Sequence, residues 1–259
     1  MGLKSENGQK NYTPVKSAAR AIEILEILAA RGGVPARLVD LAEELDAPRS
    51  SVHALIRTLC DVGWVRTDAT GTVYTLGLRC LLVGTSILDS DPYVRVARPI
   101  LSDLRDNLGE TVHFGRIEQD KIVYLATFEG GKEIRPFTRV GRAMPTYCTS
   151  LGKALLAARE ELPDPPLEPL TPQTITNIDT LKTELNEAQV QGFAFDHEEN
   201  TPGISCVGVP LKYTNPISDA ISCSVPVARM TAPYREKVTA ALLEAAARIE
   251  QSAPVQGAI

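Results

Sequence analysis

Apolar residues recur at helical spacing through most of residues 15–108. Each run places its apolar positions on one face and its charged residues on the other, as amphipathic helices do. We therefore predict helices over residues 15–31, 37–45, 48–62, 76–88 and 94–108. The positions expected to face a core are Ala18, Ile22, Leu25 and Leu28, then Leu38, Leu41, Ala42 and Leu45, then Val52, Leu55, Ile56, Leu59 and Val62, and finally Val96, Ile100, Leu101 and Leu104.

The segment 46–75 has the layout of a winged helix-turn-helix. The two residues after the second helix leave room only for a tight turn. Pro48 suits the first turn of the next helix, where its missing N–H is not needed. Gly63 is a favoured residue just past a helix end. The β-prone runs 64–66 and 73–75 flank a turn rich in Asp, Thr and Gly, which predicts a hairpin, the wing.

The exposed face of the predicted third helix carries a polar stripe. Arg49, His53 and Arg57 are spaced by four residues, so they lie on one side of a helix. Guanidinium groups pair with guanine edges and with phosphates, which favours insertion into a DNA major groove. The alternative is a helical pair with an ordinary solvated face, but the short turn and the wing favour DNA binding. We predict DNA contacts from Arg49, Ser50, Ser51, His53, Arg57 and Arg66.

Charge limits how strongly one copy is expected to bind DNA. Residues 15–79 hold eight basic and eight acidic side chains, and the whole chain of 259 residues has a net charge of −5. One copy then neutralises few phosphates and binds weakly, so pairing of copies would compensate. The same balance argues against the alternative of a structural protein that binds DNA without any ligand.

Composition narrows the remaining classes. Hydrophobic residues make up 44% and charged residues 23% of the chain, as in globular proteins. The polar opening residues lack the apolar segment of a signal peptide, and no run of about 18 apolar residues predicts a membrane helix. We therefore expect a cytoplasmic protein without a membrane partner. Five scattered cysteines and three histidines make a metal site improbable, and we expect no cofactor.

An enzyme is the third functional class. Its candidate nucleophiles are Cys148, Ser150, Cys206 and Ser224, and its candidate bases are His113 and His197. No nucleophile elbow, phosphate loop or metal signature accompanies them. His197 directly follows Asp196 and is expected to point to the opposite face of a strand. The sequence thus favours a protein that is not an enzyme.

From Gly109 onwards the pattern changes to alternation. We predict strands over residues 111–117, 122–128, 134–140, 193–197, 205–213 and 220–227, and helices over residues 148–159, 179–191 and 232–252. The Pro-rich residues 160–176 are expected to form a loop. Strand pairs mixed with helices, without regular β–α–β alternation, predict an α+β domain with a mostly antiparallel sheet.

Polar side chains mark two places in this second domain. Thr149 and Ser150 are good N-caps for the helix that follows, whose free first-turn amides attract an anion. Ser222 and Ser224 lie on the same face of a strand, which indicates a small polar-lined pocket. Two surface serines would give the same pattern.

Several segments together resemble the IclR family of bacterial transcriptional regulators, over nearly all of residues 15–252. They are RSSVHALIRTLCDVGWVRTD with YTLG, PTYCTSLGKALLA, FDHEENTPGISCVGVPL and AISCSVP. The resemblance implies a winged helix-turn-helix at 15–77, after a flexible arm at 1–14. It further implies a linker helix at 78–91 and a GAF-like effector-binding domain at 92–259. Dimers that pair through the DNA-binding half, often assembled into tetramers, are also implied.

By position, the resemblance assigns effector binding to Met144, Ser150, Leu151, Asp196, Cys206, Ser222 and Ser224. Many family members bind small organic, aromatic or sugar acids, so a carboxylate-type effector is expected. One of Arg135, Arg139 and Arg142 is placed to pair with its carboxylate, unless all three are solvated. The resulting hypothesis is a regulator that binds a pseudo-palindromic operator as a dimer or tetramer and responds to this effector.

Overall fold

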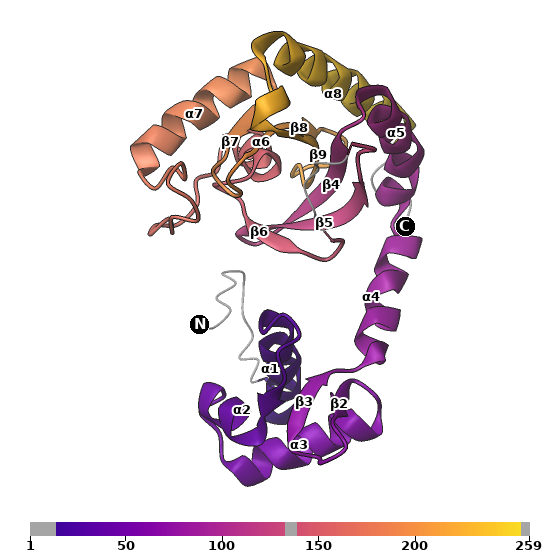
Figure 1. The fold of residues 1–259 in the computed structure, drawn as a ribbon, viewed down its shortest axis with the longest axis vertical. Helices are drawn as coiled ribbons and strands as arrows, with labels where there is room; N and C mark the ends of the chain where they lie inside the picture. The colour runs from indigo at the N-terminus through magenta and orange to yellow at the C-terminus, as the bar shows by residue number, and fades with distance from the viewer. Residues whose placement is uncertain (1–13, 133–138, 255–259) are drawn as a thin grey trace. The chain divides into compact units, whose positions relative to one another are not determined.

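The computed structural model describes residues 14–132 and 139–254. The chain divides into two compact units, Met1–Asp89 and Ser90–Ile259, whose helices and strands are labelled in Figure 1. All but the last residue of the predicted arm lies outside the described residues, as does most of the predicted strand 134–140. None of the described helices has the length and apolar character needed to cross a membrane.

The N-terminal unit packs three helices and a small antiparallel sheet around one apolar core. The helices are α1 (Lys16–Ala30), α2 (Leu38–Glu44) and α3 (Arg49–Asp61). The strands are β1 (Ala36–Arg37), β2 (Val65–Thr67) and β3 (Val73–Leu76), in the order β1-β3-β2. β2 and β3 form the predicted wing, so the winged helix-turn-helix is confirmed. β1 was not predicted, because two residues are too few to show alternation.

The buried face of α1 differs from the predicted one. Ile24 and Leu28 are buried, but Ile22 is 57% exposed. α1 carries apolar residues around most of its circumference, so spacing supports two overlapping faces, and packing against α3 and β3 decides between them. The prediction for Val62 is also wrong. Val62 is 46% exposed because α3 ends before it and the chain turns through Gly63, whose φ is +79°.

Two helices follow the wing and differ sharply in burial. They are α4 (Leu78–Ser90) and α5 (Pro92–Leu108). The first starts later than the predicted helix 76–88, because Leu76 still belongs to β3. α4 has no buried residue despite its apolar sequence. α5 buries one face and is capped by Asp91, whose carboxylate accepts two backbone N–H groups of the first turn.

The C-terminal unit is built on one antiparallel sheet (Figure 1). Its strands are β4 (Thr111–Glu118), β5 (Lys121–Phe128), β6 (Ala143–Pro145), β7 (Ala194–His197), β8 (Ile204–Leu211) and β9 (Asp219–Pro226). The order is β6-β5-β4-β9-β8-β7, and every neighbouring pair is antiparallel. The predicted α+β class with an antiparallel sheet is therefore confirmed.

Helices cover both faces of this sheet, since every residue of the central strand β9 is buried. α6 (Ser150–Arg159) packs on one face against β7, β8 and β9, with α7 (Ile178–Gln191) outside it. α5 and α8 (Ala232–Ser252) pack together on the other face (Figure 1). The apolar core lies between these layers.

The register of the strands places polar side chains in one row. Asp196 pairs with Cys206, and Cys206 pairs with Ser224, across β7, β8 and β9. Next to this row is Gly208, where a Cβ atom would lie 2.3 Å from the backbone oxygen of Ser150. Only glycine lets the first turn of α6 approach the sheet so closely. The fold thus brings the start of α6 over the polar row.

Candidate functional site

The polar stripe of α3 is open to a partner. Arg49, His53 and Arg57 are exposed, and within the described part of the chain their side chains make no hydrogen bond or ion pair. The opposite face of the helix buries Val52 and Ile56 in the core. α3 is thus anchored from behind and presents its charged face outward, which is the geometry of a helix that enters a DNA groove.

The other predicted DNA contacts lie close by in the same unit. Ser50 and Arg66 are exposed, and Ser51 is half-buried. The wing is closed by Asp68, whose carboxylate accepts the Thr70 hydroxyl and several backbone N–H groups. These hydrogen bonds hold the pKa of Asp68 well below its ordinary value. The acidic group is therefore engaged inside the turn, which leaves Arg66 as the free charged side chain of the strand β2.

α4 presents an apolar surface instead. The exposed apolar side chains of α4 are distributed around the helix and are 47–66% exposed, namely Leu78, Leu81, Leu82, Val83 and Ile87. Contiguous apolar patches on a surface mark sites of association.

A cavity of about 210 Å³ lies beside the start of α6 in the C-terminal unit. Half of its twelve lining residues carry a hydroxyl, and the others include an amide, a thiol, a carboxyl and a guanidinium. The lining residues are Tyr124, Arg142, Met144, Thr149, Ser150, Asp196, Asn200, Thr201, Ile204, Cys206, Ser222 and Ser224. A larger groove of about 810 Å³ lies between α7 and α8, but charges of both signs line it, and it holds none of the predicted effector-binding residues. The cavity is therefore the stronger candidate.

The start of α6 forms one wall of the cavity. Thr149 caps the helix: its hydroxyl accepts the N–H of Gly152 at 3.1 Å and donates to the backbone oxygen of Pro145 at 3.2 Å. Ser150 and Ser222 are each only 2% exposed, and neither hydroxyl has a hydrogen-bond partner among the described residues. Buried polar groups are normally paired. Ser150 and Ser222 both line the cavity, and their hydroxyls are not among the fully buried atoms that lack a partner, so they are open to hydrogen bonds from a ligand.

Asp196 is the acidic group of the cavity. It is 4% exposed, and burial raises the pKa of its carboxyl to about 7, although the backbone N–H of Glu199 donates to Oδ1 at 2.8 Å. Near neutral pH the carboxyl is then close to half protonated. In its protonated form it donates a hydrogen bond, which suits an anionic ligand.

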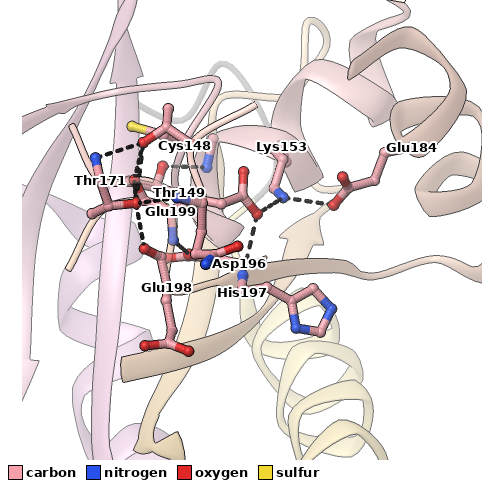
Figure 2. Close-up of polar contacts among 12 residues, drawn as sticks. Cys148, Thr149, Lys153, Thr171, Glu184, Asp196, His197, Glu198 and Glu199 are labelled. Carbon is pink, nitrogen blue, oxygen red and sulfur yellow. Dashed lines mark hydrogen bonds and ion pairs between the residues drawn. The ribbon is translucent and has the colours of Figure 1, made fainter. Parts of the chain in front are cut away.

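Behind Asp196 lies a buried ion cluster, shown in Figure 2. The Nζ atom of Lys153 is 2.6 Å from Oε1 of Glu184 and 2.6 Å from Oε1 of Glu199, and Lys153 is fully buried. Burial alone would lower the pKa of Lys153, but the two carboxylates raise it above its ordinary value. Glu199 also accepts the backbone N–H of His197 at 3.1 Å, while the His197 ring points away (Figure 2). The cluster therefore ties β7 to α6 and α7.

The structure brings together six of the seven predicted effector-binding residues. The cavity is lined by Met144, Ser150, Asp196, Cys206, Ser222 and Ser224. Leu151 is the exception: it is 1% exposed and packs in the core with Ile122 and Leu155, because the next position on a helix points about 100° away from Ser150.

Of the three arginines predicted to pair with the effector, one lines the cavity. Arg142 lines the cavity, Arg139 is exposed and does not line it, and Arg135 lies outside the described residues. Tyr124, Asn200, Thr201 and Ile204 line the cavity without having been predicted. Their loop and strand positions carry no local signal of a shared site.

The candidate catalytic residues do not assemble into a known catalytic arrangement. Nε2 of His113 lies 3.2 Å from Oγ of Ser224, and Nδ1 lies 3.1 Å from Oγ1 of Thr127. Burial lowers the pKa of His113 to about 3, so it is a weak base, and a hydroxyl rather than a carboxylate orients it. His197 is exposed on the other face of β7. Among the described residues, no group of three or more His, Cys, Asp or Glu is placed to hold a metal ion.

Family models match both units of the chain. The IclR helix-turn-helix domain matches residues 17–69, and the bacterial transcriptional regulator IclR C-terminal domain matches residues 85–251. The chain belongs to the IclR family of bacterial transcriptional regulators. It is 29% identical over 246 residues to the HTH-type transcriptional regulator BhcR of Paracoccus denitrificans. This match covers 92% of this chain and 88% of that protein.

Solved structures of IclR regulators share the fold. The IclR transcriptional regulator from Alicyclobacillus acidocaldarius is 25% identical with a TM-score of 0.78, and the match covers 92% of this chain and 99% of that chain. An IclR homologue from Microbacterium hydrocarbonoxydans complexed with 4-hydroxybenzoate is 21% identical with a TM-score of 0.71. The match covers 91% of this chain and 98% of that chain. The second likeness concerns the fold alone. The relatives found are named transcriptional regulators rather than enzymes.

Proposed function

We propose that this IclR-family regulator is controlled by a small carboxylic acid that binds in the cavity beside α6. The carrying observation is that the Ser150 and Ser222 hydroxyls line the cavity and have no hydrogen-bond partner among the described residues. A polar ligand in the cavity can form hydrogen bonds with both hydroxyls. The free amides of the first turn of α6 favour an anion there, and Arg142 adds a cation. Met144, Asp196, Cys206 and Ser224 complete the proposed contacts.

DNA binding is assigned to α3 and the wing. Arg49, His53 and Arg57 enter the major groove together with Ser50 and Ser51, and Arg66 lies near the phosphates. The support is the exposed, unpaired stripe on a helix whose other face is buried. Side chains so placed pair with base edges or with phosphates.

The protein acts as a homodimer or as a tetramer built from dimers. The exposed apolar side chains of α4 support pairing, since no described residue of the chain buries them. Pairing also explains how a DNA-binding unit with balanced charge attains useful affinity. Two copies related by a twofold axis require a pseudo-palindromic operator whose half-sites lie about one helical turn, or a multiple of it, apart. Because bacterial DNA lies in the cytoplasm, the protein acts there.

The effector changes operator affinity by favouring one arrangement of the paired winged helices. The change is no larger than the preference of the effector for that arrangement. Repression and activation are both compatible with this scheme.

Titration of promoter DNA with and without short carboxylic acids tests the proposal. The promoter region next to the gene serves as the probe, and one acid is expected to change the affinity at least about fivefold. Ser222→Ala is expected to abolish this response and to leave the affinity without ligand intact, whereas Ser252→Ala, at an exposed position, changes neither. If no acid changes the affinity, the protein is instead a DNA-binding protein without a ligand. A footprint of one asymmetric half-site would contradict the dimer.

A further inference from the structure

We propose that a second groove of the C-terminal unit is a docking site for a basic segment of a partner protein. This acidic groove has a volume of about 660 Å³ and is lined by the turn of the β4–β5 hairpin, the end of β6 and the segment that joins α6 to α7. It shares no lining residue with the cavity beside α6. The inference therefore goes beyond the proposed function, since it involves neither the effector nor the DNA-binding helix.

The charged side chains of the acidic groove are all of one sign. Among the described residues it is lined by Asp120, Glu161, Asp164 and Glu168 and by no lysine, arginine or histidine. Glu161 pairs with Arg159 at 2.9 Å. The other three carboxylates are exposed and make no hydrogen bond or ion pair within the described part of the chain. Carboxylates gathered on one surface repel one another, and a cationic partner removes that repulsion.

Apolar side chains line the same groove. Leu162 and Leu170 are each 45% exposed, and Pro163 and Pro166 line the groove with them. Folding leaves the two leucines half in water, so burial against a partner still stabilises them. Apolar side chains combined with exposed charges are the anatomy of a protein interface, whereas small-molecule sites enclose their few polar groups. This lining favours a protein segment over a small cation.

The segment 160–176 is held in a fixed shape by contacts with the rest of the unit. Leu167 is buried in the core cluster that joins α6 and α7. The Tyr147 hydroxyl donates to the backbone oxygen of Glu168 at 2.7 Å. The Thr171 hydroxyl donates to the backbone oxygen of Glu198 at 2.8 Å, near the end of β7 (Figure 2). A partner that docks here therefore loses little binding energy to the ordering of this segment.

The occupant that fits this groove carries lysine or arginine together with apolar side chains. DNA has the same sign of charge as the groove and is repelled from it. Proteins that bind DNA carry basic surfaces. A protein bound next to this regulator on the same DNA therefore offers a segment of the required chemistry, and the acidic groove supplies a contact between the two.

Fluorescence anisotropy of the full chain with labelled peptides tests the inference. The basic probe is a short peptide of lysine, leucine and serine. Glutamate replaces lysine in one control peptide, and serine replaces leucine in the other. The basic probe is expected to bind at least about tenfold more tightly than either control, and to lose affinity as salt is raised, because salt screens exposed charges.

Substitutions at exposed positions separate the groove from the general charge of the protein. Asp164→Asn and Glu168→Gln together are expected to weaken binding of the basic probe at least about fivefold. Glu187→Gln and Glu236→Gln, which remove two exposed charges at the groove between α7 and α8, form the matched control and should change it by less than about twofold. Leu170→Ser is expected to weaken binding about threefold, because it removes an apolar contact.

Several outcomes would overturn the inference. They are equal binding of the basic and acidic peptides, no binding of the basic probe at millimolar concentration, equal losses in the two double variants, and no loss in Leu170→Ser. Displacement of the probe by spermidine at equal affinity would assign the groove to a small cation instead. A change of oligomeric state in the groove variant alone, measured by sedimentation, would assign it to a second copy of the chain. Failure of the proposed function leaves these results unchanged, since neither effector nor DNA is present.

Discussion

Helix α3 and the cavity of the C-terminal unit both carry polar side chains, but the two regions hold them in opposite ways. On α3, Arg49, His53 and Arg57 project from the surface without polar contacts to the rest of the described chain. At and behind the cavity, Asp196 and Lys153 are buried, and each contacts Glu199: Asp196 accepts its backbone N–H, and Lys153 forms an ion pair with its carboxylate. Exposed polar groups contribute little to folding, whereas buried ones are costly to leave unpaired. We therefore expect substitutions on α3 to change recognition alone, and substitutions around the cavity to change stability as well.

The largest effect is expected for Lys153→Met. The substitution leaves Glu199, which is 2% exposed, without its cation. Removal of one partner from a buried ion pair costs about 3–5 kcal/mol of unfolding free energy. Urea unfolding followed by circular dichroism measures this loss.

The loss should also depend on pH with a definite sign. Burial raises the pKa of Glu199, and Lys153 opposes that rise. Without the lysine the pKa of Glu199 rises further, so the stability of the variant falls more steeply than that of the wild type as pH rises. Lys182→Met, on the exposed face of α7, is the matched control and should change stability by less than about 0.5 kcal/mol. Equal losses in the two variants would contradict the role of the cluster.

Arg57→Ala tests the opposite side of the comparison. We expect operator binding to weaken by about 1–3 kcal/mol if Arg57 contacts a base, with relaxed preference at that base pair. The unfolding free energy should not change, because Arg57 is exposed and unpaired. Fluorescence anisotropy with operator DNA and with scrambled DNA measures the loss of affinity and the change in sequence preference.

Arg79→Ala, at an exposed position of α4, serves as the control for Arg57. A uniform loss on all DNA sequences would make Arg57 a phosphate contact. No loss on any DNA would remove α3 from the interface.

The sequence predicted which residues lie together on α3, but only some of the residues that line the cavity. The α3 stripe depends on one helical period, so Arg49, His53 and Arg57 were placed together without knowledge of the fold. Ser222 and Ser224 were likewise placed on one face by strand alternation. Their alignment with Asp196 and other cavity residues was not predictable in this way, because it depends on the register of separate strands, which no local pattern records.

The errors have equally local causes. Ile22 was assigned to the core because α1 is apolar on most sides, and only tertiary packing selects Ile24 instead. Leu151 came from resemblance by position, yet its side chain packs beneath the cavity. Tyr124 and Asn200 line the cavity from elements that sequence spacing gave no reason to join.

Asp196 is expected to make both the stability of the protein and its affinity for the effector depend on pH. Its folded-state pKa is raised by burial from 3.8 to about 7, so folding favours the protonated form, and the unfolding free energy falls as pH rises across that interval. A bound carboxylate also favours protonated Asp196, since the ionised forms repel each other. Effector affinity should therefore fall above neutral pH, by up to about tenfold per pH unit.

Calorimetry across the neutral range checks the Asp196 prediction, with Asp196→Asn as the variant that removes the titrating group. Its affinity should be nearly independent of pH. Glu199 and Lys153, the neighbouring charges, remain in both proteins, so a slope that persists in the variant would assign the effect to them.

The smallest effect is expected for Val62→Thr, and it tests the exposure of a residue that helical spacing assigned to the core. Val62 is 46% exposed just past the end of α3, so a hydroxyl there stays in water and stability should change by less than about 0.5 kcal/mol. Val52→Thr places the same hydroxyl on the same helix at a position with no exposure, where an unpaired hydroxyl costs about 1–3 kcal/mol. Thermal unfolding of the two variants separates the anchored face of α3 from its open end. Equal losses would mean that Val62 is covered in solution, and because the described unit leaves it open, a second copy would then be the covering surface.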